Sequence, residues 1–205
     1  MGSPPRASVH DAAHWDQRYA DPARVPFVAP EPVVTDVVSD VVTDVVADVV
    51  AGVPGACGTA LDIACGEGRH AVWLAEQGWR VTAIDFSAAG IATGRALGAA
   101  HGVDVEWVVG DVRTWRPAAA YDLVLTCFVH LEEQTLRSVR SWLAPGGHLV
   151  LVSHGAGPGG PGPRFRTTVA AMRERAGDLE VLECREVAGE AERSSRILLH
   201  ARRPA

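Results

Sequence analysis

A short loop with two glycines, Gly66-Glu67-Gly68, is the part of this 205-residue sequence best suited to bind a small ligand. It follows an apolar run, TALDIA, and precedes a segment with helical character. Residues without side chains let a backbone pass close to a ligand, and a helix N-terminus favours negative charge. The loop is therefore suited to a carboxylate or a phosphate group of a ligand.

The glycines alone are compatible with a dinucleotide. Gly66, Gly68 and Ala71 satisfy the pattern GxGxxG/A, and Asp85 follows about twenty residues later, where an acidic residue would bind a ribose. A nicotinamide dehydrogenase is therefore one hypothesis.

Two further carboxylates favour a different ligand. Asp62, four residues before the first glycine, suits an ammonium group better than a pyrophosphate. Asp111, in the run VVGDV, could accept a hydrogen bond from an adenine amino group. Together these carboxylates indicate a ligand that carries both an ammonium group and an adenosine.

Two histidines are candidates for catalysis. His130 and His154 each come at the end of an expected strand, both at the carboxyl edge of the expected sheet. The imidazoles could share one pocket and titrate near neutral pH, as substrate contacts or general bases, with His14 as a third candidate. The alternative is that they are polar residues at a wet rim. No third ligand is suitably spaced, so no metal site is predicted.

The elements that would position these residues alternate regularly. Expected strands over residues 59–64, 79–85, 105–111, 121–130 and 148–154 are separated by expected helices over 71–77, 88–101 and 132–143. This alternation predicts a parallel sheet covered on both faces, with ligands at the carboxyl ends of its strands. A Gly/Pro-rich loop over residues 155–163, a helix over 165–176 and an antiparallel edge hairpin of residues 179–187 and 195–203 complete the expected fold.

The repetitive segment TDVVSDVVTDVVADVV has the period of a helix. A strand would place valines and aspartates on the same face, whereas a helix separates them into one apolar and one polar side. Pro32 and Gly52 are suited to the two ends, so a helix over residues 33–51 is predicted. Four aspartates argue against a membrane span, and aspartates one turn apart cannot converge on calcium.

Composition limits the remaining classes. The formal net charge is −6 and no lysine occurs, so general binding to nucleic acids or anionic membranes is not expected. The four cysteines are widely spaced, and no apolar leader is evident at the N-terminus. We therefore expect reduced thiols and a cytoplasmic protein.

The ordered motifs resemble those of class I S-adenosylmethionine-dependent methyltransferases. The resemblance rests on LDIACGEG, AIDFS, GDV, YDLVL and LAPGGHLVLV. HWDQRYADP and CGEGRHAVWLAEQGWRVTAIDFS are similar to a small-molecule subgroup that includes tellurite-resistance and thiopurine-type methyltransferases. The resemblance implies a Rossmann-like, mostly parallel seven-stranded α/β sheet with helices on both faces and an antiparallel C-terminal strand. It also implies a tail and lid over residues 1–32 and one methyltransferase domain over residues 33–205.

The resemblance also implies a cofactor, S-adenosylmethionine, with S-adenosylhomocysteine as its product. Around the methionine part it places Asp62, Cys65, Gly66 and Gly68, and core packing is the alternative role of Cys65. Cys127 would line the pocket near the sulfonium.

The adenosine part is assigned in the same way. The resemblance implies that Asp85 binds the ribose hydroxyls, that Phe86 packs on the adenine, and that Asp111 and the backbone of Val112 hold the adenine edge. Phe86 could instead only pack at a helix entry.

The N-terminal segment contributes three further residues by this resemblance. Trp15, Tyr19 and Arg24 lie in a segment that folds over the cofactor in the family, although the two aromatic residues could simply anchor the segment. Arg69 could contact a ligand or only form a salt bridge.

Function is predicted as in-line transfer of a methyl group to a small-molecule nucleophile. No NPPY-like motif follows the fourth strand, which argues against methylation of nucleic-acid bases. A non-methylating enzyme of the same fold, such as a cyclase, is the alternative. The oligomeric state is not predicted. Arginines over residues 164–175 could attract an acidic substrate, but a solvated helix face is the favoured interpretation.

Overall fold

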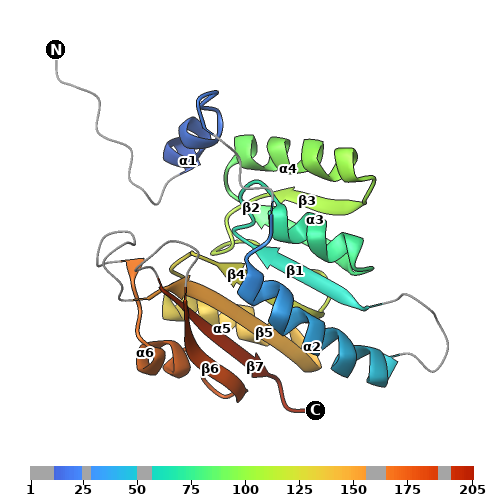
Figure 1. Cartoon of the computed structure of the whole chain (residues 1–205), viewed down its shortest axis with the longest axis vertical. Coiled ribbons are helices and arrows are strands. Elements are labelled where there is room, and N and C mark those ends of the chain that lie inside the picture. The colour runs from blue at the N-terminus through green and yellow to red at the C-terminus, as the bar shows by residue number, and fades with distance from the viewer. Residues whose placement is uncertain (1–11, 25–28, 50–56, 156–164, 189–194) are drawn as a thin grey trace.

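A seven-stranded sheet forms the centre of the computed structural model, which describes residues 12–24, 29–49, 57–155, 165–188 and 195–205 (Figure 1). The strand order is β3-β2-β1-β4-β5-β7-β6. The first five strands are parallel, and β7 is antiparallel to both β5 and β6. The predicted Rossmann-like fold is confirmed. The strands are β1 (Thr59–Ile63), β2 (Arg80–Asp85), β3 (Val105–Val109), β4 (Tyr121–Cys127), β5 (Leu143–His154), β6 (Glu180–Ala188) and β7 (Ser195–Arg202).

Helices cover both faces of the sheet. One apolar cluster joins the sheet to α2 (Pro32–Val49), α3 (Arg69–Glu76) and α4 (Ala88–His101), and a second joins the opposite face to α5 (Glu133–Ser141) and α6 (Val169–Glu174). Figure 1 shows α2 and α3 in front of the sheet and α5 behind it. A further helix, α1 (Ala12–Tyr19), packs on α4.

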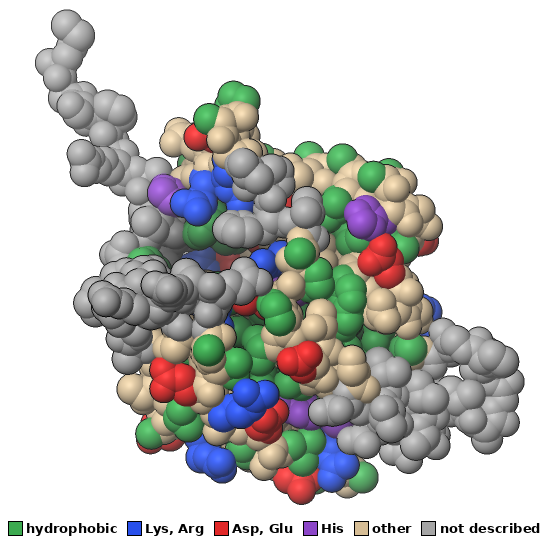
Figure 2. Space-filling view, viewed as in Figure 1, with side chains coloured by type: hydrophobic (Ala, Val, Ile, Leu, Met, Phe, Trp, Pro, Cys, Tyr) green, Lys and Arg blue, Asp and Glu red, His purple; other side chains and the backbone are tan. Residues whose placement is uncertain are grey.

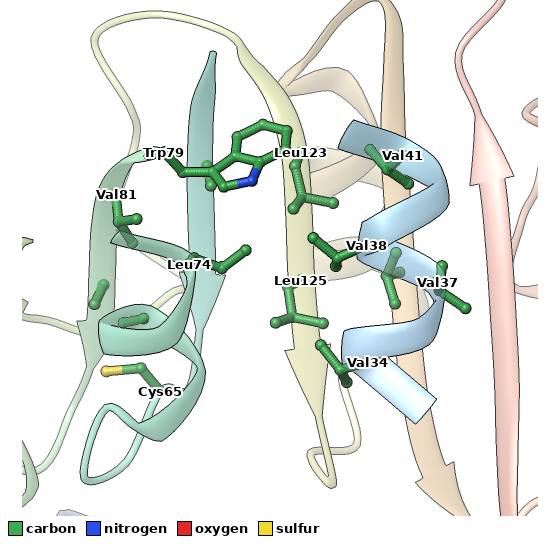
Figure 3. Packing of buried hydrophobic residues seen from close by; sticks show 14 of the residues in the cluster. Val34, Val37, Val38, Val41, Cys65, Leu74, Trp79, Val81, Leu123 and Leu125 are labelled. Carbon is green, nitrogen blue, oxygen red and sulfur yellow. The ribbon is translucent and has the colours of Figure 1, made fainter. Parts of the chain in front are cut away.

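The valine-rich helix α2 is docked by its apolar side. Val34, Val38 and Val41 are fully buried, and Figure 3 shows them directed toward Leu123 and Leu125 of β4. Asp36 and Ser39 are exposed on the other side. Burying valine offsets its poor helix propensity, so the helix is stabilised by packing. The side chains of Asp40 and of residues 42–49 lie outside the described part of the chain.

Three boundaries differ from the predicted ones by three residues or more. The helix expected over residues 165–176 begins only at Val169, because Thr168 caps it with a hydrogen bond from Ala171 N and Arg166 pairs with the end of β5. β4 ends at Cys127 because Phe128 has a positive φ of 60°. β5 begins at Leu143, earlier than expected.

Helix α1 was not predicted, since its sequence was assigned only to a tail and lid. The Gly/Pro-rich loop lies outside the described residues except for Gly155. All four cysteines are unpaired, as expected. Among the described helices, none is long and apolar enough to cross a membrane.

Candidate functional site

The glycine loop turns tightly between β1 and α3. Gly66 and Gly68 have φ values of 56° and 78°, in the left-handed region that favours glycine. The N–H of Gly68 donates to the carbonyl of Cys65 at 2.9 Å. A Cβ at Gly68 would collide with the ring of Trp107, so this glycine permits close packing of the loop against β3. A Cβ at Gly66 would lie 2.6 Å from the Tyr19 hydroxyl.

Asp85, at the end of β2, holds this loop in place. Its carboxylate accepts hydrogen bonds from the backbone N–H of Gly66 at 2.9 Å and of Ser87 at 2.8 Å. Burial raises the pKa of Asp85, while these two hydrogen bonds oppose the shift. A carboxylate has about four acceptor positions, so Asp85 can accept further hydrogen bonds from a ligand diol.

Asp62, in β1, carries a buried oxygen whose hydrogen-bonding capacity no described residue uses. Its side chain is buried, and its Oδ2 has no hydrogen-bond partner among the described residues. Burial, reinforced by the charge of Asp85, raises the pKa of Asp62 to about 8, although Arg69 and the N–H of Ala71 lower it. A buried acceptor without a partner is costly, and a ligand ammonium group would satisfy it.

Helix α1 is fixed to the start of α4 by Asp16. The Asp16 carboxylate accepts hydrogen bonds from the Ser87 hydroxyl at 2.5 Å and from the Ala89 N–H at 3.0 Å. An acidic side chain at a helix N-terminus is stabilising. This contact brings the N-terminal segment next to the Asp85 region.

Three predicted residues of the N-terminal segment gather here. The rings of Trp15 and Tyr19 are 5.6 Å apart, and the Arg24 guanidinium lies 5.0 Å from the Tyr19 ring centre. Arg24 also forms an ion pair with Glu67 of the glycine loop. Burial and the charge of Asp85 raise the pKa of Tyr19, which stays protonated. The structure therefore brings Trp15, Tyr19 and Arg24 to the glycine loop.

The two predicted cysteines lie at the same edge of the sheet. Cys65 is buried, and Cys127 packs against the cluster on the α2 side. Burial, with Asp62 nearby, raises the pKa of both thiols well above the ordinary value. Neither thiol is an activated nucleophile.

The predicted adenine contacts lie beside Asp85. The N–H of Gly110 donates to the Asp85 carbonyl at 2.9 Å, which places the segment after β3 next to β2. Asp111 binds Arg113, whose Nη2 is 2.6 Å from Oδ2, and this pairing lowers the pKa of Asp111. Val112 packs against the cluster on the α5 side, and Phe86 is half-buried. Their contact with adenine stays a prediction.

A group that we call the Phe128 cluster lies after β4, and sequence reasoning missed most of it. The Phe128 ring is 4.5 Å from the ring of His154, and the guanidinium groups of Arg69 and Arg196 lie 5.9 and 5.0 Å from its centre. Both arginines bind the carboxylate of Glu31, which is buried. The cluster consists of Glu31, Arg69, Phe128, His154 and Arg196.

His70 joins this cluster to helix α3 and was also missed. Its Nε2 accepts the backbone N–H of Glu31 at 3.2 Å, and burial lowers the pKa of His70 to about 3. The neutral imidazole therefore fixes the segment that leads into α2. No sequence signal distinguished His70 from the rest of the helix.

The two candidate catalytic histidines have different surroundings. His130 lines a pocket with Thr126, Met172 and Arg175 between the sheet and the α5–α6 side, whereas His154 is not among the residues lining that pocket. His154 stacks on Phe128 in the Phe128 cluster, where burial and the charge of Arg196 lower its pKa. β4 ends at Cys127, and the chain turns at Phe128 before it reaches His130. A pocket shared by the two imidazoles stays a prediction.

No group of three His, Cys, Asp or Glu residues suited to a metal ion occurs within the described ranges. Of the predicted arginines, Arg175 lines the His130 pocket and donates to the carbonyl of Leu131 at 2.5 Å. Arg173 is exposed. The segment is thus not a single basic face.

The strand order, with helices on both faces, is the fold of class I methyltransferases. In open α/β sheets of this kind, ligands bind at the carboxyl ends of the parallel strands. Residues 60–147 match the family model described as "Methyltransferase domain". This match covers less than half of the chain, which is therefore similar to that domain over these residues. The buried acceptor of Asp62 and the carboxylate of Asp85 fit the ammonium and ribose groups of S-adenosylmethionine.

Curated relatives share part of the sequence. Ribosomal RNA small subunit methyltransferase C from Chromohalobacter salexigens is 34% identical over 107 residues, which are 46% of this chain and 31% of that protein. A ubiquinone biosynthesis O-methyltransferase from Rickettsia canadensis is 30% identical over 95 residues, 44% of this chain and 40% of that protein. The chain thus spans less than half the length of these relatives.

Solved structures show the same fold at low identity. N-methyltransferase NodS from Bradyrhizobium japonicum, in complex with S-adenosyl-L-homocysteine, has a TM-score of 0.68 and 19% identity, covering 95% of this chain and 98% of that chain. TehB from Haemophilus influenzae has a TM-score of 0.62 and 18% identity, covering 94% of this chain and 66% of that chain. The [4+2]-cyclase SpnF has a TM-score of 0.64 and 19% identity, covering 83% of this chain and 81% of that chain.

Proposed function

We propose that the chain transfers a methyl group from S-adenosylmethionine to a nucleophilic atom of a small molecule. The observation that carries the proposal is the buried Asp62 carboxyl beside the Gly66 loop and Asp85, because its Oδ2 has no hydrogen-bond partner within the described ranges. An ammonium group and a ribose on one ligand would satisfy both carboxylates. A nicotinamide dinucleotide offers no ammonium group to Asp62.

The residues of the chain would act mainly by binding and alignment. The cofactor supplies an activated methyl group on a sulfonium, with a neutral thioether as the leaving group. Asp62 and Asp85 hold the two ends of the cofactor, and α1 with Tyr19 excludes water from one side of the site. Alignment of a nucleophile in a dry site can supply roughly 7 to 11 kcal/mol of the barrier.

The remaining assignments belong to the same proposal. The methionine part of the cofactor would lie against Cys65, Gly66 and Gly68. The adenine would lie against Phe86, Asp111 and Val112, and the sulfonium would lie near Cys127. Trp15, Tyr19 and Arg24 would close over the cofactor. His130 and His154 would contact the acceptor from two sides. The division into a lid over residues 1–32 and a domain over residues 33–205 is proposed with them.

A small-molecule acceptor is supported by the relative named as a ubiquinone biosynthesis O-methyltransferase and by the net charge of −6. The relative named as a ribosomal RNA methyltransferase matches only 31% of its own length. The likeness to TehB supports the tellurite-resistance and thiopurine-type subgroup only at the level of the fold. The fold of SpnF, a cyclase, keeps a non-methylating reaction as the second candidate.

Product masses distinguish the two candidates. The purified chain would be incubated with panels of thiols, phenols, amines and halides, with and without S-adenosylmethionine. We expect a cofactor-dependent mass gain of one methyl group and formation of S-adenosylhomocysteine. An Asp85→Asn variant should lose both products together, whereas the exposed Asp104→Asn should keep them.

A product of unchanged mass, formed without consumption of the cofactor, would instead support the cyclase-like alternative. Methyl gain in the absence of S-adenosylmethionine would contradict both candidates.

A further inference from the structure

Two arginines from distant parts of the chain form ion pairs with one carboxylate, that of Glu31, in the Phe128 cluster. Nη2 of Arg69, at the start of α3, lies 3.2 Å from Oε1 of Glu31. Nε of Arg196, at the start of β7, lies 3.4 Å from Oε2 of the same carboxylate. The Glu31 side chain thus shows that these guanidinium groups converge on the position of a carboxylate.

The cluster has more positive than negative charge. Arg69 and Arg196 together carry two positive charges, whereas Glu31 carries one negative charge. The lowered pKa of His154 keeps its imidazole neutral near neutral pH. Only Nε of Arg196 takes part in a hydrogen bond with a described residue. Its two terminal nitrogens can therefore donate to a second anionic group.

The cluster lies beside the reaction centre expected from the proposed function. Phe128 directly follows Cys127, and Asp62, Arg69 and Glu31 are all close enough to shift the pKa of the Cys127 thiol. Side chains of Arg69, Arg196 and Glu31 are 17%, 15% and 11% exposed, so they are partly accessible. Figure 2 shows basic and acidic side chains together in the recess below α1.

We propose that Arg196 and Arg69 bind a carboxylate of the acceptor, so that the substrates of this site are carboxylate-bearing small molecules. The inference rests on the proposed methyltransferase function and specifies its substrate class. Glu31 competes for the same guanidinium groups when no acceptor is bound. Phe128 provides the apolar wall on which the arginines lie.

Binding of a simple carboxylate tests the inference. The chain saturated with S-adenosylhomocysteine would be titrated with benzoate and with benzamide, which has the same ring but no charge. We expect benzoate to bind about tenfold more tightly, since charge-assisted bonds to arginine are roughly twice as strong as neutral ones. Arg196→Gln should reduce this preference to about twofold or less. Glu31→Gln should tighten benzoate binding several-fold, a gain that a merely structural ion pair would not produce.

Two controls separate the possible failures. Arg137→Gln, at an exposed arginine of α5, should leave the benzoate preference unchanged. S-adenosylhomocysteine affinity should be the same in wild type and Arg196→Gln, which also shows that the variant folds. A tenfold loss of that affinity would assign the arginine pair to the carboxylate of the cofactor and overturn the inference.

Equal affinity for benzoate and benzamide in the wild type would also overturn it. If the wild type binds no S-adenosylhomocysteine, the proposed function fails, and the benzoate titration of the free chain still decides whether the arginine pair holds a carboxylate.

Discussion

Asp62 and Asp85 are both buried carboxyl groups near the carboxyl ends of neighbouring strands, but their hydrogen bonds and pKa values differ. Asp85 accepts two backbone hydrogen bonds and so shapes the loop that it helps to form. Asp62 keeps one oxygen without a partner among the described residues, and its pKa is raised to about 8. At neutral pH the free protein therefore holds Asp62 mostly protonated, and a bound ammonium group would favour its ionised form.

This coupling predicts proton release when the cofactor product binds. Calorimetry of S-adenosylhomocysteine binding at pH 7, in buffers of different ionisation enthalpy, should show release of about one proton. Asp62→Asn should abolish the release and weaken binding, whereas the exposed Asp104→Asn should change neither. The same buffer dependence in wild type and Asp62→Asn would show that Asp62 does not ionise on binding.

The pH dependence of stability gives a second readout for Asp62. Its pKa in the folded chain exceeds the ordinary value of 3.8, so the folded state binds the proton more tightly than the unfolded state. Its contribution to stability is thus fully present below about pH 4 and is lost as the pH rises toward 8. In Asp62→Asn that part of the decline should disappear.

At the residue scale, sequence reasoning was most specific where spacing along one segment was informative. Asp62, the glycines and Asp85 were predicted as site residues from their spacing along one strand–loop–helix–strand unit. Glu31 and Arg196 were missed because 165 positions separate them, and only the antiparallel pairing of β7 with β5 brings them together. His130 and His154 were placed by their strand ends alone, which does not fix the side of the sheet that each faces.

At the scale of elements, α2 shows how an unusual sequence forms an ordinary docked helix. Val34, Val37, Val38 and Val41 are buried, and Asp36 is exposed. The period predicted this correctly, because a helix separates valines from aspartates in the repeat. The short helix α1 was not predicted, since its stability depends on tertiary contacts such as Asp16 with Ser87.

Val41→Asp should therefore destabilise the whole domain. Placing a carboxylate in a fully buried valine site would cost about 3 kcal/mol or more, lowering the melting temperature by roughly 10 °C. Thermal unfolding followed by circular dichroism measures this change, with Asp36→Asn as the matched control on the exposed side of the same helix. The docked orientation would be contradicted if the melting temperatures of Val41→Asp and the control differed by less than about 2 °C, which corresponds to a stability difference on the order of 1 kcal/mol.

At the scale of the molecule, the strand order places all the candidate groups at one edge. β1 and β4 are neighbours in the middle of the sheet. The strands that follow β1 in sequence, β2 and β3, lie on one side of this pair, and β5 lies on the other side. Such a reversal of strand order is where ligands bind in open α/β sheets. Alternating strands and helices predicted the parallel sheet covered on both faces, whereas the seven-stranded arrangement was implied by the family resemblance. The ends of β4 and α6 were less predictable because local turns at Phe128 and Thr168 set them.

The central claim is that this edge binds S-adenosylmethionine, and direct calorimetry with S-adenosylhomocysteine and NAD tests it most simply. We expect S-adenosylhomocysteine to bind to one site per chain, NAD not to bind, and Asp85→Asn to weaken the binding by about tenfold or more, the loss of a charge-assisted pair of hydrogen bonds. Tight binding of NAD with no binding of S-adenosylhomocysteine would contradict the account.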